Sequence, residues 1–121
     1  MRTVRIHEAA SQEAIEAAAW YENERAGLGA EFQRAIDVAL DLLEEDIVPL
    51  APVPTATKAR GAKRLVLRRF PFDVVVVEHP KEAFVIAFAH HARRPGYWRQ
   101  RQQEPVENPS IPASPDEEGS A

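Results

Sequence analysis

The spacing of apolar positions predicts two helices in the first half of the chain. Residues 8–24 are rich in alanine, with small apolar side chains at helical spacing, and alanine is the best helix former. Between Leu28 and Leu43 apolar residues return every three or four positions, as on one face of an amphipathic helix. Residues 25–29 interrupt the pattern, and Gly27 is expected there in the left-handed conformation that ends a helix. We therefore predict a hairpin of two antiparallel helices.

Strand patterns lie before and after this hairpin. Residues 3–7 and 64–69 alternate apolar with polar side chains, as short strands do. Residues 72–79 form a β-branched run too apolar to leave either face bare, which predicts a central strand, and residues 84–90 form another apolar strand. The sequence predicts an α+β fold: a strand, a two-helix hairpin and a three-stranded antiparallel meander, with the helices packed on one sheet face.

Proline marks two irregular segments. Pro49, Pro52 and Pro54 predict a loop that continues neither helix nor sheet. Residues 102–121 contain four prolines and five acidic residues with few apolar side chains. Burial of so few apolar groups cannot offset the entropy lost on ordering, so this segment is expected to be disordered on its own. The expected organisation is one domain over residues 1–101 and an acidic, proline-rich tail over residues 102–121.

Length and composition narrow the class of protein. A chain of 121 residues is long enough for one small core. It has no cysteine, which excludes a disulfide framework and thiolate chemistry. Neither a signal peptide nor an apolar run of the roughly 18 residues that a membrane span needs is visible, so we expect a soluble, cytoplasmic protein with no membrane partner.

The formal net charge of −4 conceals a segregation of charge. Residues 1–57 hold four Arg and eleven acids (−7), residues 58–101 hold eleven Lys or Arg and three acids (+8), and the tail holds five acids (−5). Such asymmetry points to a polyanionic partner for the middle section. The alternative is that the two halves neutralise each other in the fold.

Candidate chemistry is concentrated in residues 84–101, FVIAFAHHARRPGYWRQR. Since side chains alternate along a strand, Phe84, Ile86, Phe88 and His90 are expected on one face, and His91 on the other. Adjacent histidines that point opposite ways cannot easily share an ion, and no cysteine or acidic cluster is near, so we expect no metal and no cofactor. The alternative to a chemical role is one histidine in the core and one at the surface.

Several arginines come from strands that are predicted to be neighbours. Guanidinium groups that converge on one concave face can hold phosphate oxygens and stabilise developing negative charge. The alternative is a solvated or acid-paired face. Tyr97 is able to donate a proton, stack on a base or pack against the sheet, whereas Trp98 is expected in the core. The arginines are Arg64, Arg68, Arg69, Arg93 and Arg94.

Three stretches together resemble a known family. They are WYENERAGLGAEFQRAIDVAL at residues 20–40, LVLRRFPFDVVV at residues 65–76 and AHHARRPGYWRQR at residues 89–101. In this order and spacing they resemble the RelE/ParE superfamily of toxins from bacterial type II toxin–antitoxin modules, in particular members described as ParE or plasmid-stabilisation proteins. The resemblance covers about residues 4–101 and implies a growth-inhibiting toxin that an antitoxin neutralises in a hetero-oligomer.

The resemblance implies two alternative targets. ParE-like members inhibit DNA gyrase and would not be enzymes, whereas RelE-like members cleave messenger RNA on the ribosome without a metal, the 2′-hydroxyl attacking the adjacent phosphate. Here the helices carry no lysine, and Arg34 is the only base of the second helix, which favours the gyrase-directed alternative. A third possibility is a catalytically silent binding module of the same fold.

The resemblance also assigns candidate residues by motif. The catalytic candidates are Arg68, Arg69, His90, His91, Arg93, Arg94 and Tyr97. The candidates for nucleic-acid or target binding are Lys58, Arg60, Lys63, Arg64, Trp98 and Arg99. The candidates for antitoxin binding are Trp20, Tyr21, Leu28 and Phe32. For Phe32 a place in the core is the stronger expectation, whereas Trp20 and Leu28 are expected at the surface.

Overall fold

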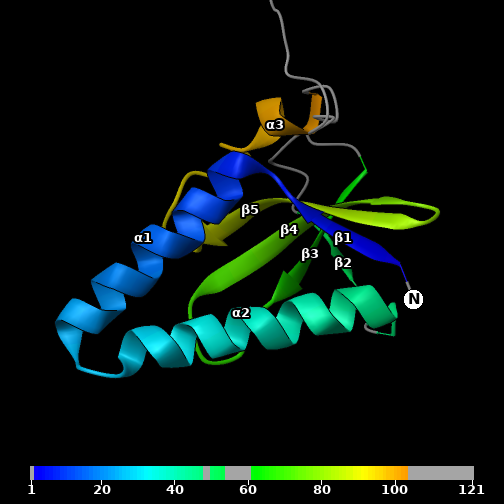
Figure 1. Cartoon of the computed structure of the whole chain (residues 1–121). Coiled ribbons are helices and arrows are strands. Elements are labelled where there is room, and N and C mark those ends of the chain that lie inside the picture. The colour runs from blue at the N-terminus through cyan, green and yellow to red at the C-terminus, as the bar shows by residue number, and fades with distance from the viewer. Residues whose placement is uncertain (1, 48–49, 54–60, 104–121) are drawn as a thin grey trace, which may run out of the picture.

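A single five-stranded sheet forms the centre of the computed structural model, which describes residues 2–47, 50–53 and 61–103 (Figure 1). The strand order is β1-β5-β4-β3-β2, and β1 pairs with β5 in parallel while the other neighbours are antiparallel. The strands are β1 (Thr3–Ile6), β2 (Ala51–Pro52), β3 (Ala62–Val66), β4 (Phe72–His79) and β5 (Glu82–His90). The helices are α1 (Glu8–Glu24), α2 (Leu28–Glu45) and α3 (Arg99–Gln103).

The prediction of an α+β protein is confirmed, with two corrections to the strands. Pro52, which was expected in a loop, lies in β2 at the edge of the sheet. An edge strand tolerates proline because one side of its backbone needs no donor for the ladder. In addition, β3 ends at Val66, so Arg68 and Arg69 lie in the connection to β4 and not on a strand.

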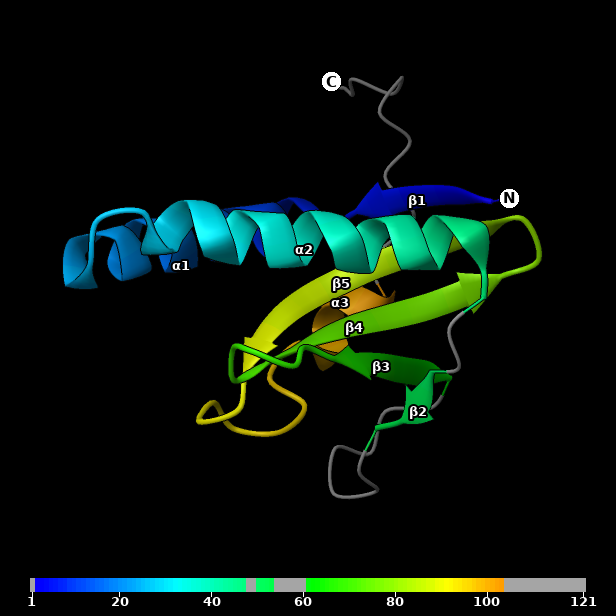
Figure 2. The same cartoon turned by 90° about the horizontal axis from the view of Figure 1, so that it is seen from below.

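The helix hairpin covers one face of the sheet (Figure 2). Gly27 has the expected positive φ, of 90°, but serves as the N-cap of α2, because α1 already ends at Glu24. Beyond it the helices approach closely: a Cβ on Gly29 would lie 2.6 Å from the carbonyl oxygen of Ala18. The core between hairpin and sheet is built from Phe32, Ile36, Leu43, Val74, Val76, Val85 and Phe88, among others.

A bulge in β5 changes which side chains face the helices. Val75 pairs with Ala87 but Val76 pairs with Val85, so Ile86 is an extra residue in the ladder. Ile86 and Ala87 consequently both face away from the helices, whereas Phe88 faces them. The strict alternation predicted for residues 84–90 is therefore wrong beyond Ile86, because a bulge shifts the two-residue period by one.

The last described segment covers the opposite face of the sheet, where α3 lies across from α2 (Figure 1). Trp98 is 4% exposed and packs with Val75, Phe84 and Ile86, as expected of a core residue. The short helix α3 was not predicted, and it includes the first two residues of the expected tail, 102 and 103. Residues 104–121 of that tail lie outside the described residues. Of the helices described, none is long and apolar enough to cross a membrane.

Candidate functional site

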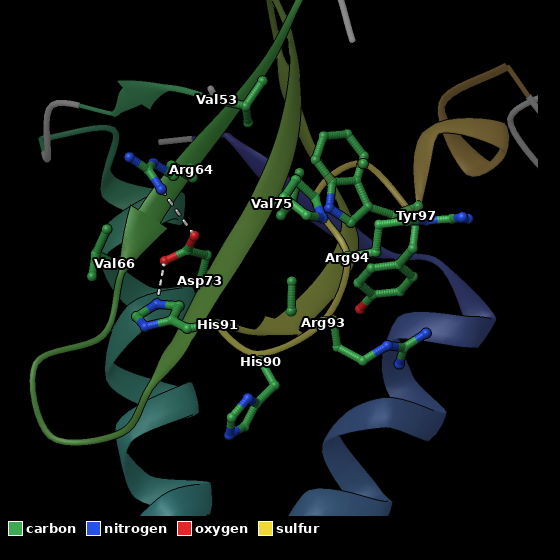
Figure 3. A pocket seen from close by; sticks show the side chains of 14 residues that line it. Val53, Arg64, Val66, Asp73, Val75, His90, His91, Arg93, Arg94 and Tyr97 are labelled. Carbon is green, nitrogen blue, oxygen red and sulfur yellow. Dashed lines mark hydrogen bonds and ion pairs between the residues drawn. The ribbon is translucent and has the colours of Figure 1, made fainter. Parts of the chain in front are cut away.

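A pocket of about 440 Å³ opens on the sheet face opposite the helix hairpin (Figure 3). Its floor is apolar and its walls carry arginine and histidine side chains. We call it the basic pocket. It is lined by Val53, Arg64, Val66, Asp73, Val75, Ala89, His90, His91, Arg93, Arg94, Pro95, Gly96, Tyr97 and Trp98.

Asp73 organises one wall of the basic pocket. Its Oδ2 atom lies 3.2 Å from Nη1 of Arg64, and its Oδ1 atom lies 2.8 Å from Nε2 of His91, as the dashed lines in Figure 3 show. The pairing of β3 with β4 and of β4 with β5 brings these three residues together. Arg64 is thus already matched by an internal carboxylate, although its buried Nε atom has no hydrogen-bond partner among the described residues.

The opposite wall comes from the turn after β5. The backbone N–H of His91 donates to the carbonyl of Pro71, and that of Tyr97 donates to the carbonyl of Arg94. The guanidinium carbon of Arg93 lies 3.8 Å from the centre of the Tyr97 ring, a cation–π contact. Arg93 and Arg94 are exposed, and within the described parts of the chain neither forms an ion pair.

Glu13 on α1 holds this turn and α3 against the sheet. Its carboxylate accepts a hydrogen bond from the Tyr97 hydroxyl at 2.6 Å and two from the Arg101 guanidinium at 3.1 Å each. It also accepts one from the backbone N–H of Phe88, next to the bulge, at 3.0 Å. Glu13 was not among the residues predicted from the sequence. The signal in the sequence was the position of Glu13 beside Ala14 in an alanine-rich helix, on a side that the structure buries in part.

This network determines the chemical state of Tyr97. Burial and the hydrogen bond to Glu13 raise the pKa of the Tyr97 hydroxyl well above its usual value, because both disfavour the phenolate. The hydroxyl therefore keeps its proton, which is directed at Glu13 rather than into the basic pocket.

His90 stands where β5 ends and turns away from the Asp73 cluster (Figure 3). Its ring packs edge-on against Phe72 at a centroid distance of 5.0 Å, and its Nδ1 atom accepts the N–H of Ala92 at 2.9 Å. On the helix side of the sheet it also lines a second pocket, of about 170 Å³. We call this the apolar pocket; it is lined by Ala17, Trp20, Tyr21, Phe72 and His90.

The structure brings together part of the predicted catalytic set. The basic pocket collects His90, His91, Arg93, Arg94 and Tyr97. Arg68 and Arg69 do not line it, since they follow β3 in a separate turn.

The remaining basic candidates are dispersed or paired. Arg69 is matched by Glu31 on α2, at 2.7 Å. Lys63 is paired with Glu78 at 3.0 Å. Arg99 is exposed, and its Nε donates to the carbonyl of Gly96 at 3.3 Å. Lys58 and Arg60 lie outside the described residues.

The four antitoxin-binding candidates differ in accessibility. Trp20 is 58% exposed, whereas Phe32 is fully buried beneath the ring of Tyr21 and has no surface to offer a partner. Tyr21 and Leu28 are half-buried and pack against the core. Phe32 is buried because α2 presents it to Phe70 and Phe72.

Across the described residues, no three His, Asp or Glu side chains gather closely enough to hold a metal ion together. The donors of the basic pocket are instead suited to anions, since guanidinium groups bind carboxylate and phosphate oxygens.

The fold and pocket define a small α+β class: a helix hairpin on one sheet face and, on the other, a basic pocket beside the turn that follows the last strand. No protein-family model matches the sequence, and no curated protein matches it. A chain in the solved structure of the chromosomal ParDE TA system from P. aeruginosa has a similar fold. The TM-score is 0.56 over 74% of this chain and 96% of that chain, with 15% sequence identity. At this identity the similarity establishes the fold.

Proposed function

We propose that this protein is the toxin of a type II toxin–antitoxin pair and that it inhibits growth by acting on DNA gyrase, as ParE-like toxins do. Two independent observations support the toxin assignment: the three sequence stretches that resemble the RelE/ParE superfamily, and the fold shared with a chain of the ParDE system. The proposed partner is a cognate antitoxin, which binds the toxin and silences it.

The observation that carries the choice of target is the hydrogen bond that the Tyr97 hydroxyl donates to Glu13. Cleavage of RNA through its 2′-hydroxyl needs a group that accepts the hydroxyl proton and groups that stabilise the developing charge. The Tyr97 hydroxyl is protonated and committed to Glu13, and two of the predicted arginines, Arg64 and Arg69, are neutralised by internal carboxylates. A binding role toward gyrase requires none of these groups to be free.

RNA cleavage is the second candidate, because His91, Arg93 and Arg94 line an open pocket. His91, whose Nε2 atom donates to Asp73, would then accept the proton at Nδ1, and the arginines would stabilise the phosphate. This candidate differs from the first in its product, since a nuclease leaves cut transcripts and a gyrase inhibitor leaves broken or relaxed DNA.

The test begins with induced expression of the chain in a bacterium, alone and together with the adjacent gene. Growth arrest that the adjacent gene relieves is expected, and normal growth with a well-folded protein would indicate a silent binding module. Purified protein is then assayed for gyrase-dependent DNA cleavage and supercoiling, and translated transcripts are mapped for cuts by primer extension. An effect on gyrase with intact transcripts is the expected result; cut transcripts with unaffected gyrase would contradict the choice of target.

A further inference from the structure

We infer that the basic pocket binds the phosphate backbone of the duplex DNA that gyrase holds, so that the protein contacts the enzyme and its DNA together. This inference rests on the proposed function and adds the chemistry of a second contact, to the nucleic acid. The phosphates are bound by Arg93, Arg94 and Arg99. Three observations support it: the separation of charge between the two sides of the sheet, the availability of these arginines, and the small amount of free aromatic surface in the pocket.

The two sides of the sheet differ in charge. On one side, α1 and α2 together carry ten acidic residues and a single arginine. On the other side, the basic pocket is lined by three arginines and one aspartate, which gives a formal charge of +2 with both histidines neutral. Duplex DNA carries one negative charge per ~1.7 Å of its length, so it repels the hairpin and attracts the pocket. The pocket side of the molecule therefore faces the DNA.

Arg93 and Arg94 are available to a ligand. They lie across the pocket from Asp73, which is already paired with Arg64 and His91 (Figure 3). Both arginines are exposed, and no ion pair joins either of them to another residue that the structure describes. Accessible guanidinium groups without a carboxylate partner are suited to bidentate contacts with phosphate oxygens.

The turn after β5 holds Arg93 in place and adds a third cation. The guanidinium carbon of Arg93 lies 3.8 Å from the centre of the Tyr97 ring, and Glu13 fixes that ring by accepting a hydrogen bond from its hydroxyl at 2.6 Å. Arg99 is exposed at the start of α3, and its backbone N–H and its Nε both donate to the carbonyl of Gly96. One short segment thus presents three arginines, and a side chain that is already held in place loses less entropy on binding.

The same pocket offers little surface to an unpaired base. Sequence-specific recognition of single-stranded RNA depends largely on bases that stack on exposed aromatic rings. Trp98 is 4% exposed and packs in the core. The guanidinium carbons of Arg93 and Arg101 lie 3.8 and 5.3 Å from the centre of the Tyr97 ring, which leaves little of this ring free. Contacts to phosphates alone position a protein on a duplex without reading its sequence, so the pocket favours duplex DNA over single-stranded RNA.

The experiment measures the affinity of the full chain for immobilised gyrase, alone and bound to a linear DNA duplex, by interferometry under conditions that keep the DNA on the enzyme. The complex with DNA should bind the chain more tightly. Raising the salt concentration from ~50 to ~200 mM should reduce this gain about 10-fold, as expected for two phosphate contacts. Arg93→Ala/Arg94→Ala should remove most of the gain, whereas its affinity for gyrase alone should change less than ~2-fold.

Two further variants sharpen the comparison. Arg93→Lys/Arg94→Lys keeps both charges and should retain most of the gain, since an ammonium group also binds phosphate. Arg25→Ala/Arg34→Ala removes two charges from exposed residues of the hairpin outside the pocket, and it should leave the gain unchanged within ~2-fold. Circular dichroism and thermal melts check the fold of each variant. If the double alanine variant does not fold, Arg94→Ala, which leaves the contact of Arg93 with Tyr97 in place, should lose about half of the salt dependence.

Three results would overturn the inference while leaving gyrase as the target. They are equal affinity for gyrase with and without DNA, a folded pocket variant that keeps the full gain, and an equal loss in the hairpin control. A pocket variant that loses binding to single-stranded RNA but keeps its gain on DNA would assign the pocket to the nuclease candidate instead. By contrast, a chain that neither binds nor inhibits gyrase would refute the proposed target itself, and the inference would fail with it.

Discussion

Removing the Glu13 carboxylate should lower the stability of the fold, because several segments depend on it. Glu13 joins α1, the bulge in β5, the turn at Tyr97 and α3 through side-chain hydrogen bonds. In Glu13→Ala the Arg101 guanidinium would stay largely buried without its carboxylate, and the Phe88 N–H would lose its acceptor. The C-terminal segment should then be held less firmly against the sheet.

The magnitude follows from burial. The side chains of Glu13 and Arg101 are 15% and 17% exposed, so solvent screens the pair only weakly. Removing one partner of a buried ion pair lowers the free energy of unfolding by about 3–5 kcal/mol. Because Arg101 keeps its hydrogen bond to the carbonyl of Ile86, we expect a loss at the lower end of this range, about 3 kcal/mol. For a domain of this size that loss lowers the melting temperature by about 12 °C or more. Glu13→Gln keeps an acceptor oxygen and should lose about half as much free energy.

Urea unfolding, followed by the fluorescence of the buried Trp98 in a Trp20→Phe background, measures this loss. The midpoint should fall by about 1.5 M at a typical urea dependence of about 2 kcal/mol per M. Glu16→Ala, which removes an exposed carboxylate from the same helix, is the matched control and should stay within about 0.5 kcal/mol of the unmodified chain. Equal stability of the Glu13 and Glu16 variants would refute the reasoning, as would additive effects of Glu13→Ala and Arg101→Met in a double-mutant cycle.

Three further predictions concern helix packing and pH. Gly29→Ala should lower the unfolding free energy by about 1–3 kcal/mol, because the new methyl group would meet the Ala18 carbonyl; helix propensity alone predicts a gain of about 1 kcal/mol, so stabilisation in thermal melts would disprove the close approach. The raised pKa of Tyr97, caused by burial and then by its bond to Glu13, means that the folded state retains this proton. Its stabilising contribution is present below the unfolded pKa of about 10 and is lost as pH rises beyond it, so urea midpoints should fall from about pH 10 upward, less in Tyr97→Phe; identical pH profiles would count against this. The pKa of Glu78 is lowered chiefly by its hydrogen bond from Arg2, so its contribution is present above about pH 4.3 and is lost on acidification. In Glu78→Gln the free energy of unfolding should therefore fall less steeply below about pH 4.3. An equally steep fall would show that other carboxylates cause the loss of stability in acid.

Patterns that depend on near neighbours were predicted accurately. The bounds of α1 and β4 match the predicted ranges, and the amphipathic stripe of α2 is its buried face. The positive φ of Gly27 was also expected. Helix periodicity, β-branched runs and glycine at helix ends can be recognised in short stretches of sequence, because the interactions that they reflect span only a few residues.

The candidate site was predicted in part. The run after β5 does supply the wall of the basic pocket, with His91, Arg93, Arg94 and Tyr97. The expected convergence of all five arginines did not occur, because Arg68 and Arg69 follow β3 in a separate segment, where Arg69 pairs with Glu31. Arg64 lines the basic pocket but is paired with Asp73. The pairing of carboxylates with arginines depends on contacts across the sheet and between the helix layer and the sheet. These contacts cannot be predicted from the order of charges along the sequence.

The sequence by itself determined the helix hairpin, the central strands and the family that the chain resembles, since these follow from short-range spacing and from motifs. Tertiary structure alone decided the parallel pairing of β1 with β5, the bulge at Ile86 and the role of Glu13. Strand partners and register are chosen by the packing of distant segments against one another. The bulge, by shifting the face of every later residue in β5, set His90 between two pockets and so fixed the geometry of the candidate site.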